Sequence, residues 1–471
     1  MPRNKCKSRF LFLLALLIFL LTGLNPAAEN TFSFRTQNGI NLRVIQDQQM
    51  PFIHAQVIVL FDYSNISPNQ LSPGIPALTA FHLFNQEIDE PSSPLLRSMR
   101  RLGGDYEVAL FPDYLLISLN FPNDRLSLLG GFLRDLFNYS HFYIKKLNRS
   151  LEIYWPRFFH HPDWKSILAR RLGYALLFPD QPLGFTYLPF SKLPNLNLYQ
   201  LRSFFQKNFR PHRSSVIVKG NINPHVTLGL LERSMHGSGD AERPDEITAT
   251  IPTFPPEPQR ERKIVFFPTA DSEPPLLMWL EALPEINHPQ HLAQLALHHA
   301  LFSFPGGRIY QTRFNQFSAR NYQFQSEVNH HAGIAVIIHQ VRVNPVDIEP
   351  LLGLIDQERR RLISQPLDRR EYLEAVNSFL NKAKVRTADF EHEVRNEVFQ
   401  FITGMPQPFN YWLPNMIREM SLEKTNQTIR TLLAAENRET PADLGTVVII
   451  GNREILARQT WSITVEWIDE H

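Results

Sequence analysis

Histidine is the residue type in this chain that could carry metal chemistry, and it occurs 17 times. Three adjacent pairs stand out: His160-His161, His298-His299 and His330-His331. Neighbouring side chains point apart on a helix or a strand, so one such pair is a poor ligand set for a single metal ion. Zinc bound at surface histidine pairs stays open as an alternative, but the pairs alone do not predict a catalytic centre.

No complete catalytic motif occurs elsewhere. The segment EHEVRNEVF begins like a helical HExxH zinc motif with His392 and Glu393, but Asn396 occupies the position of the second histidine. Glu393 and Glu397 lie one helical turn apart, which is typical of a solvated helix face. The sequence contains neither a GxxxxGK[ST] phosphate loop nor a GxSxG nucleophile elbow. The only cysteine is Cys6, so disulfides and a cysteine nucleophile are excluded once the first residues are removed.

The charge balance excludes an electrostatic footprint for nucleic acid. Lys and Arg number 48 against 46 Asp and Glu, which gives +2. Residues 1–28 hold four of the basic residues and no acidic residue, so the remainder carries 44 against 46, or −2. A chain near neutrality is not expected to bind the phosphate backbone. The basic run Arg359-Arg360-Arg361 is predicted to form the solvent-exposed face of an amphipathic helix.

The first residues have the plan of a secretory signal. A short cationic stretch precedes the 15-residue apolar run from Phe10 to Leu24, and small residues follow at Ala27 and Ala28. The run is short for a transmembrane helix, so cleavage near Ala28 is favoured over retention as an N-terminal anchor. We therefore expect export to the periplasm or the exterior, with membrane contact only if the leader is retained.

The rest of the chain is predicted to repeat one order of strands and helices in two halves. The stretch from Gly237 to Arg262 is rich in Gly, Pro and charge and is predicted to be a linker. The segment SSVIVKGNI before it and GTVVIIGNR near the end are predicted as matching strands. The expected fold is α+β, with two homologous domains at residues 29–236 and 263–471, each a mainly antiparallel sheet packed with helices.

Five segments resemble the pitrilysin/insulinase family of inverted-motif zinc peptidases, which includes mitochondrial processing peptidase and small bacterial two-domain members. In chain order they are NGINLRVIQDQ, SPGIPALTAFHLF, MRRLGGDYEVALFPDYLLISLNF, FFQKNFRPHRSSVIVKGNINP and LHHALFSFPGGRIYQ. Each match is modest, and their order and spacing carry the resemblance.

The resemblance implies a zinc motif HxxEH that this chain lacks. Its two ligand positions fall on Ala77 and Phe81, and the position of its general base falls on Ala80. None of these side chains can bind metal or move a proton. Shifting the register by one residue offers only His82.

Two further positions of the family pattern are also altered. The third ligand, a Glu on a later helix, corresponds to Ile153 or Tyr154, with Glu152 as a near miss. The substrate-orienting Asn of the LGG stretch corresponds to Glu107. Because these changes occur together, we expect no catalytic residues and no zinc in this chain.

The resemblance also implies an Arg and a Tyr about seven residues apart that bind the substrate backbone. Tyr322 matches the Tyr, but Asn315 occupies the position of the Arg, and the nearest cations are Arg313 and Arg320. Arg313 and Tyr322 are our candidate substrate-binding residues. The alternative is that Tyr322 is a strand residue and Arg313 a solvated helix residue.

The expected function is that of a non-catalytic subunit of an exported heterodimeric metallopeptidase, whose zinc lies in an insulinase-like paralogue and whose substrate is a peptide. A stand-alone peptide-binding or scaffold protein is the first alternative. A peptidase with a rebuilt metal site is the second alternative. Ala77, Ala80 and Phe81 argue against it, because all three motif positions lack a functional side chain.

Overall fold

The computed structural model describes residues 30–63, 72–84, 94–140, 142–235, 263–313, 322–385, 390–405, 409–435, 445–459, 461 and 463–468. The expected leader and the expected linker at residues 237–262 lie outside the described residues. Among the described residues, no helix combines the length and the apolarity that crossing a bilayer requires.

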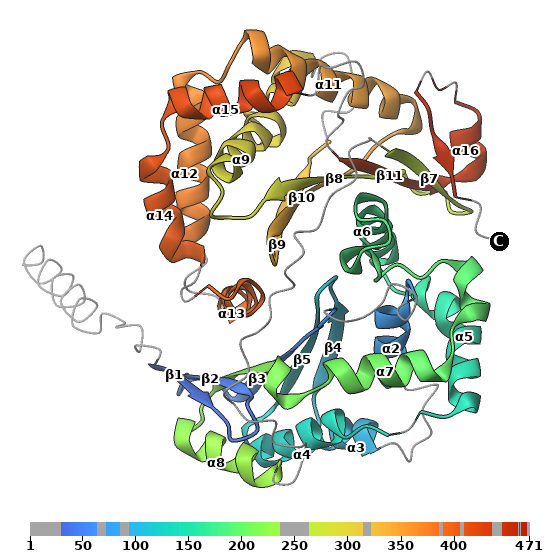
Figure 1. Cartoon of the computed structure of the whole chain (residues 1–471), viewed down its shortest axis with the longest axis vertical. Coiled ribbons are helices and arrows are strands. Elements are labelled where there is room, and N and C mark those ends of the chain that lie inside the picture. The colour runs from blue at the N-terminus through green and yellow to red at the C-terminus, as the bar shows by residue number, and fades with distance from the viewer. Residues whose placement is uncertain are drawn as a thin grey trace, which may run out of the picture.

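The described chain forms two halves, each built on a six-stranded sheet (Figure 1). The strands of the first sheet are β1 (Asn30–Arg35), β2 (Asn41–Gln46), β3 (Phe52–Leu60), β4 (Asp105–Leu110), β5 (Tyr114–Pro122) and β6 (Ser214–Gly220). Those of the second are β7 (Lys263–Thr269), β8 (Leu276–Pro284), β9 (Gln325–His331), β10 (Ile334–Arg342), β11 (Thr446–Asn452) and β12 (Glu466–Trp467).

Five strands of the two sheets share one topology, and the sheets differ in the outer strands β1 and β12. The first has the order β1-β2-β6-β3-β5-β4 and the second the order β12-β7-β11-β8-β10-β9. The pairs β2–β6, β7–β11 and β7–β12 are parallel, and the other pairs are antiparallel. The predicted α+β class with mainly antiparallel sheets is confirmed: both sheets are mixed, and most of their pairs are antiparallel.

Helices cover both sheets. Those of the first half are α2 (Ile75–Phe84), α3 (Pro94–Leu102), α4 (Leu126–Phe137), α5 (Ile144–Phe158), α6 (Trp164–Leu177), α7 (Leu198–Asn208) and α8 (Pro224–Ser234). Those of the second are α9 (Pro289–Phe302), α10 (Arg308–Arg313), α11 (Ile348–Ser364), α12 (Arg369–Val385), α13 (Phe390–Thr403), α14 (Phe409–Glu419), α15 (Leu422–Ala435) and α16 (Arg453–Ala457).

Local sequence signals set several element ends. The predicted hairpin at Asn38-Gly39 joins β1 to β2, and Gly39 adopts φ +89°, which a residue with a side chain rarely tolerates. Pro76 lies in the first turn of α2, where its missing N–H costs no helical hydrogen bond. Gly103, with φ +69°, follows the last residue of α3 as a left-handed cap.

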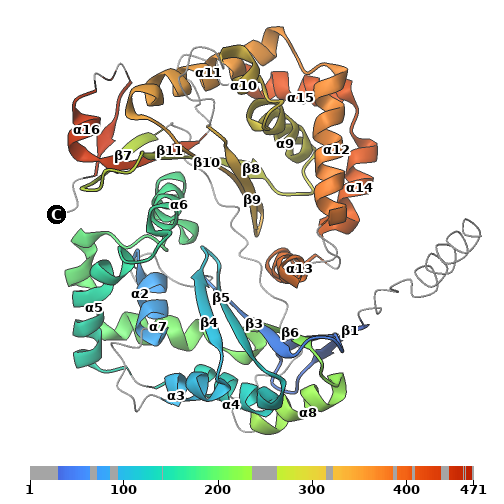
Figure 2. The ribbon, with the colours of Figure 1, turned by 180° about the vertical axis from the view of Figure 1, so that it is seen from behind.

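One helix of each half packs on the sheet of the other half. α6 of the first half packs on β8 and β11 of the second sheet, where Gly173 lies directly against Leu280. α13 of the second half packs on the first sheet, where Val394, Val398 and Ile402 share one buried cluster with Ile45, Ile58 and Ile217. Both helices lie between the two sheets in the front and back views (Figures 1 and 2). Apolar contact therefore couples the halves at two separate places.

Polar contacts accompany the first of these docking sites. Lys165 of α6 is buried and forms ion pairs with Asp271 at 2.6 Å and Glu273 at 3.0 Å. Further along α6, the Tyr174 hydroxyl lies 2.7 Å from Nε2 of His331, whose Nδ1 lies 2.9 Å from an Asp113 carboxylate oxygen. His331, from one of the histidine pairs, thus joins β9 to two elements of the first half.

The second docking site corrects a sequence-based interpretation. Glu393 and Glu397 of α13 do not form a solvated face, because both bind Arg43 of β2, at 2.8 and 3.3 Å. The Ser215 hydroxyl donates to Glu397 at 2.9 Å. The helical spacing was interpreted correctly, but the first sheet rather than water covers these two carboxylates.

Candidate functional site

The three degenerate zinc positions lie together on α2. Ala77 is buried, and Ala80 and Phe81 are partly buried against the core of the first half. The Phe81 ring meets the Tyr154 ring of α5 edge to face, with centroids 5.0 Å apart. This contact joins the two helices that the family resemblance assigns to the metal ligands. Aromatic packing therefore occupies the place where a ligand pair would need to converge.

Tyr154 is held in that contact by a polar anchor. Its hydroxyl accepts a hydrogen bond at 3.0 Å from Arg171 of α6, whose guanidinium also lies over the Phe158 ring. Burial raises the pKa of Tyr154, and the nearby Arg171 offsets this only in part. The phenol therefore stays neutral and cannot replace the missing carboxylate.

The near-miss residues point elsewhere. Glu152 is exposed and pairs with Arg149 at 2.9 Å on the outer face of α5. His82 is fully buried, stacks on Phe142, and donates from Nδ1 to the Ser150 hydroxyl at 2.9 Å. Neither side chain belongs to a metal site on α2.

The described residues do not fit a zinc centre of the inverted-motif type. No group of three or more His, Cys, Asp and Glu side chains in the described ranges is arranged to hold a metal ion. The aliphatic and aromatic side chains on α2 supply no lone pair for a metal. This structure therefore supports no step of metal-assisted hydrolysis at this position.

The first sheet does present an open edge beside α2. β4 is an edge strand, bonded to β5 alone within the described chain. A cavity of about 440 Å³ lies where β4 begins, lined among others by Phe52, His54, Gly104 and Asn120. A Cβ atom on Gly104 would lie 1.6 Å from the Asn120 carbonyl oxygen, so the close approach of the strands requires glycine there. Glu107, at the position of the family's substrate-orienting Asn, is exposed on this edge.

The two candidate substrate-binding residues lie in the second half. The Tyr322 hydroxyl donates to Asp347 at 2.8 Å and accepts from the Asn344 N–H at 2.8 Å. Burial raises the pKa of Tyr322 to about 12; the Asp347 carboxylate adds to the rise and the Asn344 N–H offsets part of it. Arg313 is the last residue of α10, and its side chain is outside the description, as are Asn315 and Arg320.

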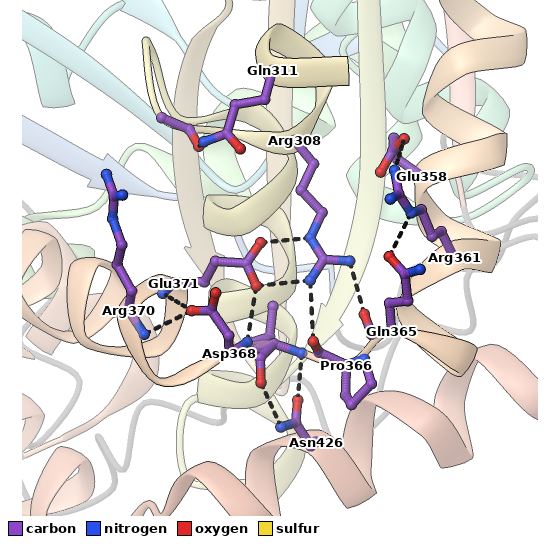
Figure 3. Close-up of polar contacts among 12 residues, drawn as sticks. Arg308, Gln311, Glu358, Arg361, Gln365, Pro366, Asp368, Arg370, Glu371 and Asn426 are labelled. Carbon is purple, nitrogen blue, oxygen red and sulfur yellow. Dashed lines mark hydrogen bonds and ion pairs between the residues drawn. The ribbon is translucent and has the colours of Figure 1, made fainter.

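Arg308, in the segment GGRIYQ that carried part of the resemblance, has a structural role (Figure 3). Its guanidinium forms a two-point ion pair with Glu371, at 2.6 and 2.7 Å. It also donates to the carbonyl oxygens of Gln365 and Pro366. Asn426 binds the backbone of Leu367 in both directions, so this loop between α11 and α12 is held from two sides (Figure 3).

A buried series of hydrogen-bonded side chains under α9 was not predicted from the sequence. The Ser326 hydroxyl lies 2.7 Å from Nδ1 of His339, whose Nε2 lies 2.9 Å from Nδ1 of His298. Nε2 of His298 lies 3.3 Å from a carboxylate oxygen of Glu281. A lone Glu in the apolar segment LLMWLEALP is the signal that could have indicated it.

This series of polar contacts ends in an ion pair, and the ion pair corrects the interpretation of the three-arginine run. Arg359 is not on a wet helix face: it is 6% exposed and binds Glu281 at 2.8 Å. Burial alone would raise the pKa of Glu281, but Arg359 and His298 hold it at about 2. The carboxylate is therefore ionised at neutral pH.

Comparison with known proteins identifies the class to which this fold belongs. Residues 195–379 match the family model described as Peptidase M16 inactive domain. No curated protein matches the sequence.

Solved structures match nearly the whole chain. The first half of the periplasmic protease PqqL from Escherichia coli superposes with a TM-score of 0.65 at 13% identity, covering 92% of this chain and 94% of that one. A peptidase M16 inactive domain from Pseudomonas fluorescens gives 0.61 at 15% identity, covering 90% and 98%. A protease from Helicobacter pylori gives 0.67 at 11% identity, covering 90% and 99%. At these identities the likeness establishes the fold, which is that of the M16 peptidases.

Proposed function

We propose that this chain is an exported, non-catalytic member of the insulinase-like M16 family that serves as the partner subunit of a zinc-bearing relative. The M16 fold over nine tenths of the chain and the match of residues 195–379 support the family. The leader-like first residues support export. The catalytic zinc would be supplied by the partner.

The observation that carries the proposal is the contact between Phe81 and Tyr154. A drifted enzyme that had lost one ligand would retain others, whereas here an aromatic pair joins the two helices that would carry the ligands. Arg171, bonded to Tyr154, fixes this arrangement from a third helix. The fold has been kept while the catalytic position has become part of the core.

A subunit without metal can still act in a peptidase if its fold encloses the peptide and holds it in place. An extended peptide can add to the free edge of β4 through main-chain hydrogen bonds. The docking of α6 and α13 keeps the two sheets facing each other around that edge. In a pair, such a subunit would complete a chamber and position the peptide for the partner's metal-bound water.

The test is reconstitution with a relative from the same cell that carries HxxEH. We expect co-elution on sizing, no cleavage of peptides by this chain alone, and increased cleavage by the partner when it is added. Unchanged partner activity with no complex would contradict the subunit role. Peptide binding by the isolated chain under those conditions would then support the stand-alone binding protein.

The two candidate substrate-binding residues can be tested in the same assay. Tyr322→Phe and Arg313→Ala would lower the activation while leaving the complex intact, if these side chains reach the peptide. Tyr199→Phe, at a tyrosine that is 76% exposed on α7, is the matched control. If both variants activate like wild type, this chain contributes enclosure and neither residue binds substrate.

A further inference from the structure

His291 of α9 is a fully buried histidine with one nitrogen uncommitted. Its Nδ1 lies 2.8 Å from the Pro284 carbonyl oxygen, to which it donates, so Nε2 carries the lone pair. Nε2 has no hydrogen-bond partner within the described chain. Metal-binding histidines commonly have this arrangement, in which a backbone carbonyl fixes one nitrogen and leaves the other for the ion.

Gln294 presents a second acceptor from the same face of α9. The two residues are three apart on the helix, so their side chains are neighbours. Gln294 is 6% exposed, and its Oε1 also lacks a partner among the described residues. Buried acceptors are normally satisfied, so two of them side by side indicate an occupant that supplies positive charge or donors.

His330 of β9 brings a second imidazole to this place. The ring centroids of His291 and His330 lie 5.7 Å apart, at 31° between the planes, and the His330 ring also packs against Phe399. A zinc–nitrogen bond of about 2.0–2.1 Å places each bound ring centre roughly 3 Å from the ion. Two rings on one ion then have centres roughly 5–6 Å apart, in agreement with the observed spacing.

Burial keeps both rings in the form that binds metal. It lowers the pKa of His291 to about 4, and it lowers the pKa of His330 well below the ordinary value, with the neighbouring His291 and His331 adding to the effect. Both imidazoles are therefore neutral at pH 7, and no proton has to leave before a cation binds.

His291 and Gln294 also hold a place in the second half that corresponds to the zinc-motif positions of the first half. α9 follows β8 as α2 follows β3, and β8 and β3 hold the same place in the two sheet orders. His291 and Gln294 are the third and sixth residues of α9, as Ala77 and Ala80 are of α2. The second half thus has donor atoms at helix positions where the first half has methyl groups.

We propose that His291, Gln294 and His330 form a site for a divalent transition metal of the zinc class, with water completing the coordination. Imidazole nitrogen and one amide oxygen suit zinc, cobalt(II) or copper(II) better than calcium or magnesium. The site is separate from the degenerate positions on α2, and it does not depend on the proposed subunit role.

The test is a cobalt(II) titration of the chelator-treated full chain, followed by visible absorption. We expect one equivalent to bind and zinc to displace it. His291→Ala and His330→Ala should each weaken binding by at least about tenfold. Gln294→Leu, which keeps the side-chain volume, should weaken it by a smaller factor. His161→Ala at an exposed histidine and His82→Ala next to the degenerate positions are the matched controls and should leave binding unchanged.

Each outcome decides the proposal. Wild-type protein that binds no cobalt at 1 mM would overturn it, because the two acceptors would then be satisfied by water. Binding that survives both histidine variants, or that is lost with His82→Ala, would place the metal elsewhere. If a histidine variant fails to fold by circular dichroism, the wild-type stoichiometry and Gln294→Leu still decide. None of these readouts uses a partner or a peptide, so failure here leaves the subunit proposal standing.

Discussion

The helices α2 and α9 hold equivalent places in the two halves, but their surroundings differ in kind. α2 has alanine and phenylalanine at the three positions that the family resemblance assigns to a zinc motif, although it also buries Thr79 and His82. α9 buries three polar side chains, His291, Gln294 and His298. The comparison shows that the fold accepts either methyl groups or side chains with donor atoms at the third and sixth positions of this helix.

The two interiors should respond differently to mutation and to pH. The contact between Phe81 and Tyr154 in the first half is aromatic, and its strength changes little between pH 4 and pH 8. The second half depends in part on charges and neutral imidazoles held out of water. Removing one partner of a buried ion pair is much more costly than removing both, because the remaining charge stays unsolvated.

The largest effect is expected from Arg359→Met. This change leaves the Glu281 carboxylate buried without its cation and should lower the free energy of unfolding by about 3–5 kcal/mol, measured by urea denaturation. Adding Glu281→Leu should restore much of the loss. Arg360→Met, at an exposed side chain of the same helix, is the control and should cost less than about 0.5 kcal/mol. A loss for Arg359→Met no larger than for the control would show that Glu281 is not held by this pair.

Acid should destabilise the second half through His291. The folded pKa of His291 is about 4, below its ordinary value of 6.5, so the unfolded chain binds more protons between these pH values. Stability therefore falls as the pH drops from 6.5 to 4, by about 3 kcal/mol for this residue. Denaturation with chelator present should show a shallower pH dependence for His291→Leu. Parallel curves for the variant and wild type would contradict the assignment.

Much of the fold was predictable because its signals are local. The apolar segments SSVIVKGNI and GTVVIIGNR contain β6 and β11, and the Asn38-Gly39 turn and the glycine cap at Gly103 are in place. The helix expected from Pro-Gly-Ile-Pro onward is also in place as α2, with Pro76 in its first turn. These features depend on neighbouring residues alone, so composition and spacing are sufficient to find them.

The buried polar contacts were not predictable for the opposite reason. A helical period indicates that Glu393 and Glu397 share a face, but not that Arg43 lies 350 or more residues away to receive them. A run of three arginines indicates a polar face without showing which of its members is buried. The chain of Ser326, His339 and His298 joins three elements, and its contacts exist only once the second sheet has formed.

An intermediate effect should follow from filling the contact between α6 and the second sheet. A methyl group at Gly173 would lie 2.3 Å from the fully buried Leu280, so Gly173→Ala should lower the free energy of unfolding by about 1–3 kcal/mol. Gly131→Ala on α4 meets no atom within 4 Å and should stabilise by up to about 1 kcal/mol. Thermal and urea unfolding measure both. If Gly173→Ala stabilises the protein as Gly131→Ala does, α6 is not tightly packed against the second sheet at Leu280.

The smallest effect concerns the polar part of the α13 contact, and it separates that contact from the buried pair under α9. Arg43 is 19% exposed and serves two carboxylates, so Arg43→Ala leaves Glu393 and Glu397 repelling each other one turn apart. We expect a loss of about 1 kcal/mol at low salt, because partly solvated pairs are weak.

Salt dependence is the decisive readout of this last comparison. In 0.5 M salt the difference between Arg43→Ala and wild type should shrink, because water and ions reach this pair, whereas the effect of Arg359→Met should persist. Arg395→Ala lies on the same helix at an exposed pair with Glu391, 3.8 Å apart, and should change stability by less than about 0.5 kcal/mol in either condition. If Arg43→Ala is as insensitive to salt as Arg359→Met, then α13 is sealed on the first sheet as tightly as Arg359 is in the second half. The contact of α13 with Arg43 and the pair of Arg359 with Glu281 would then differ in the number of carboxylates bound but not in their exclusion of water.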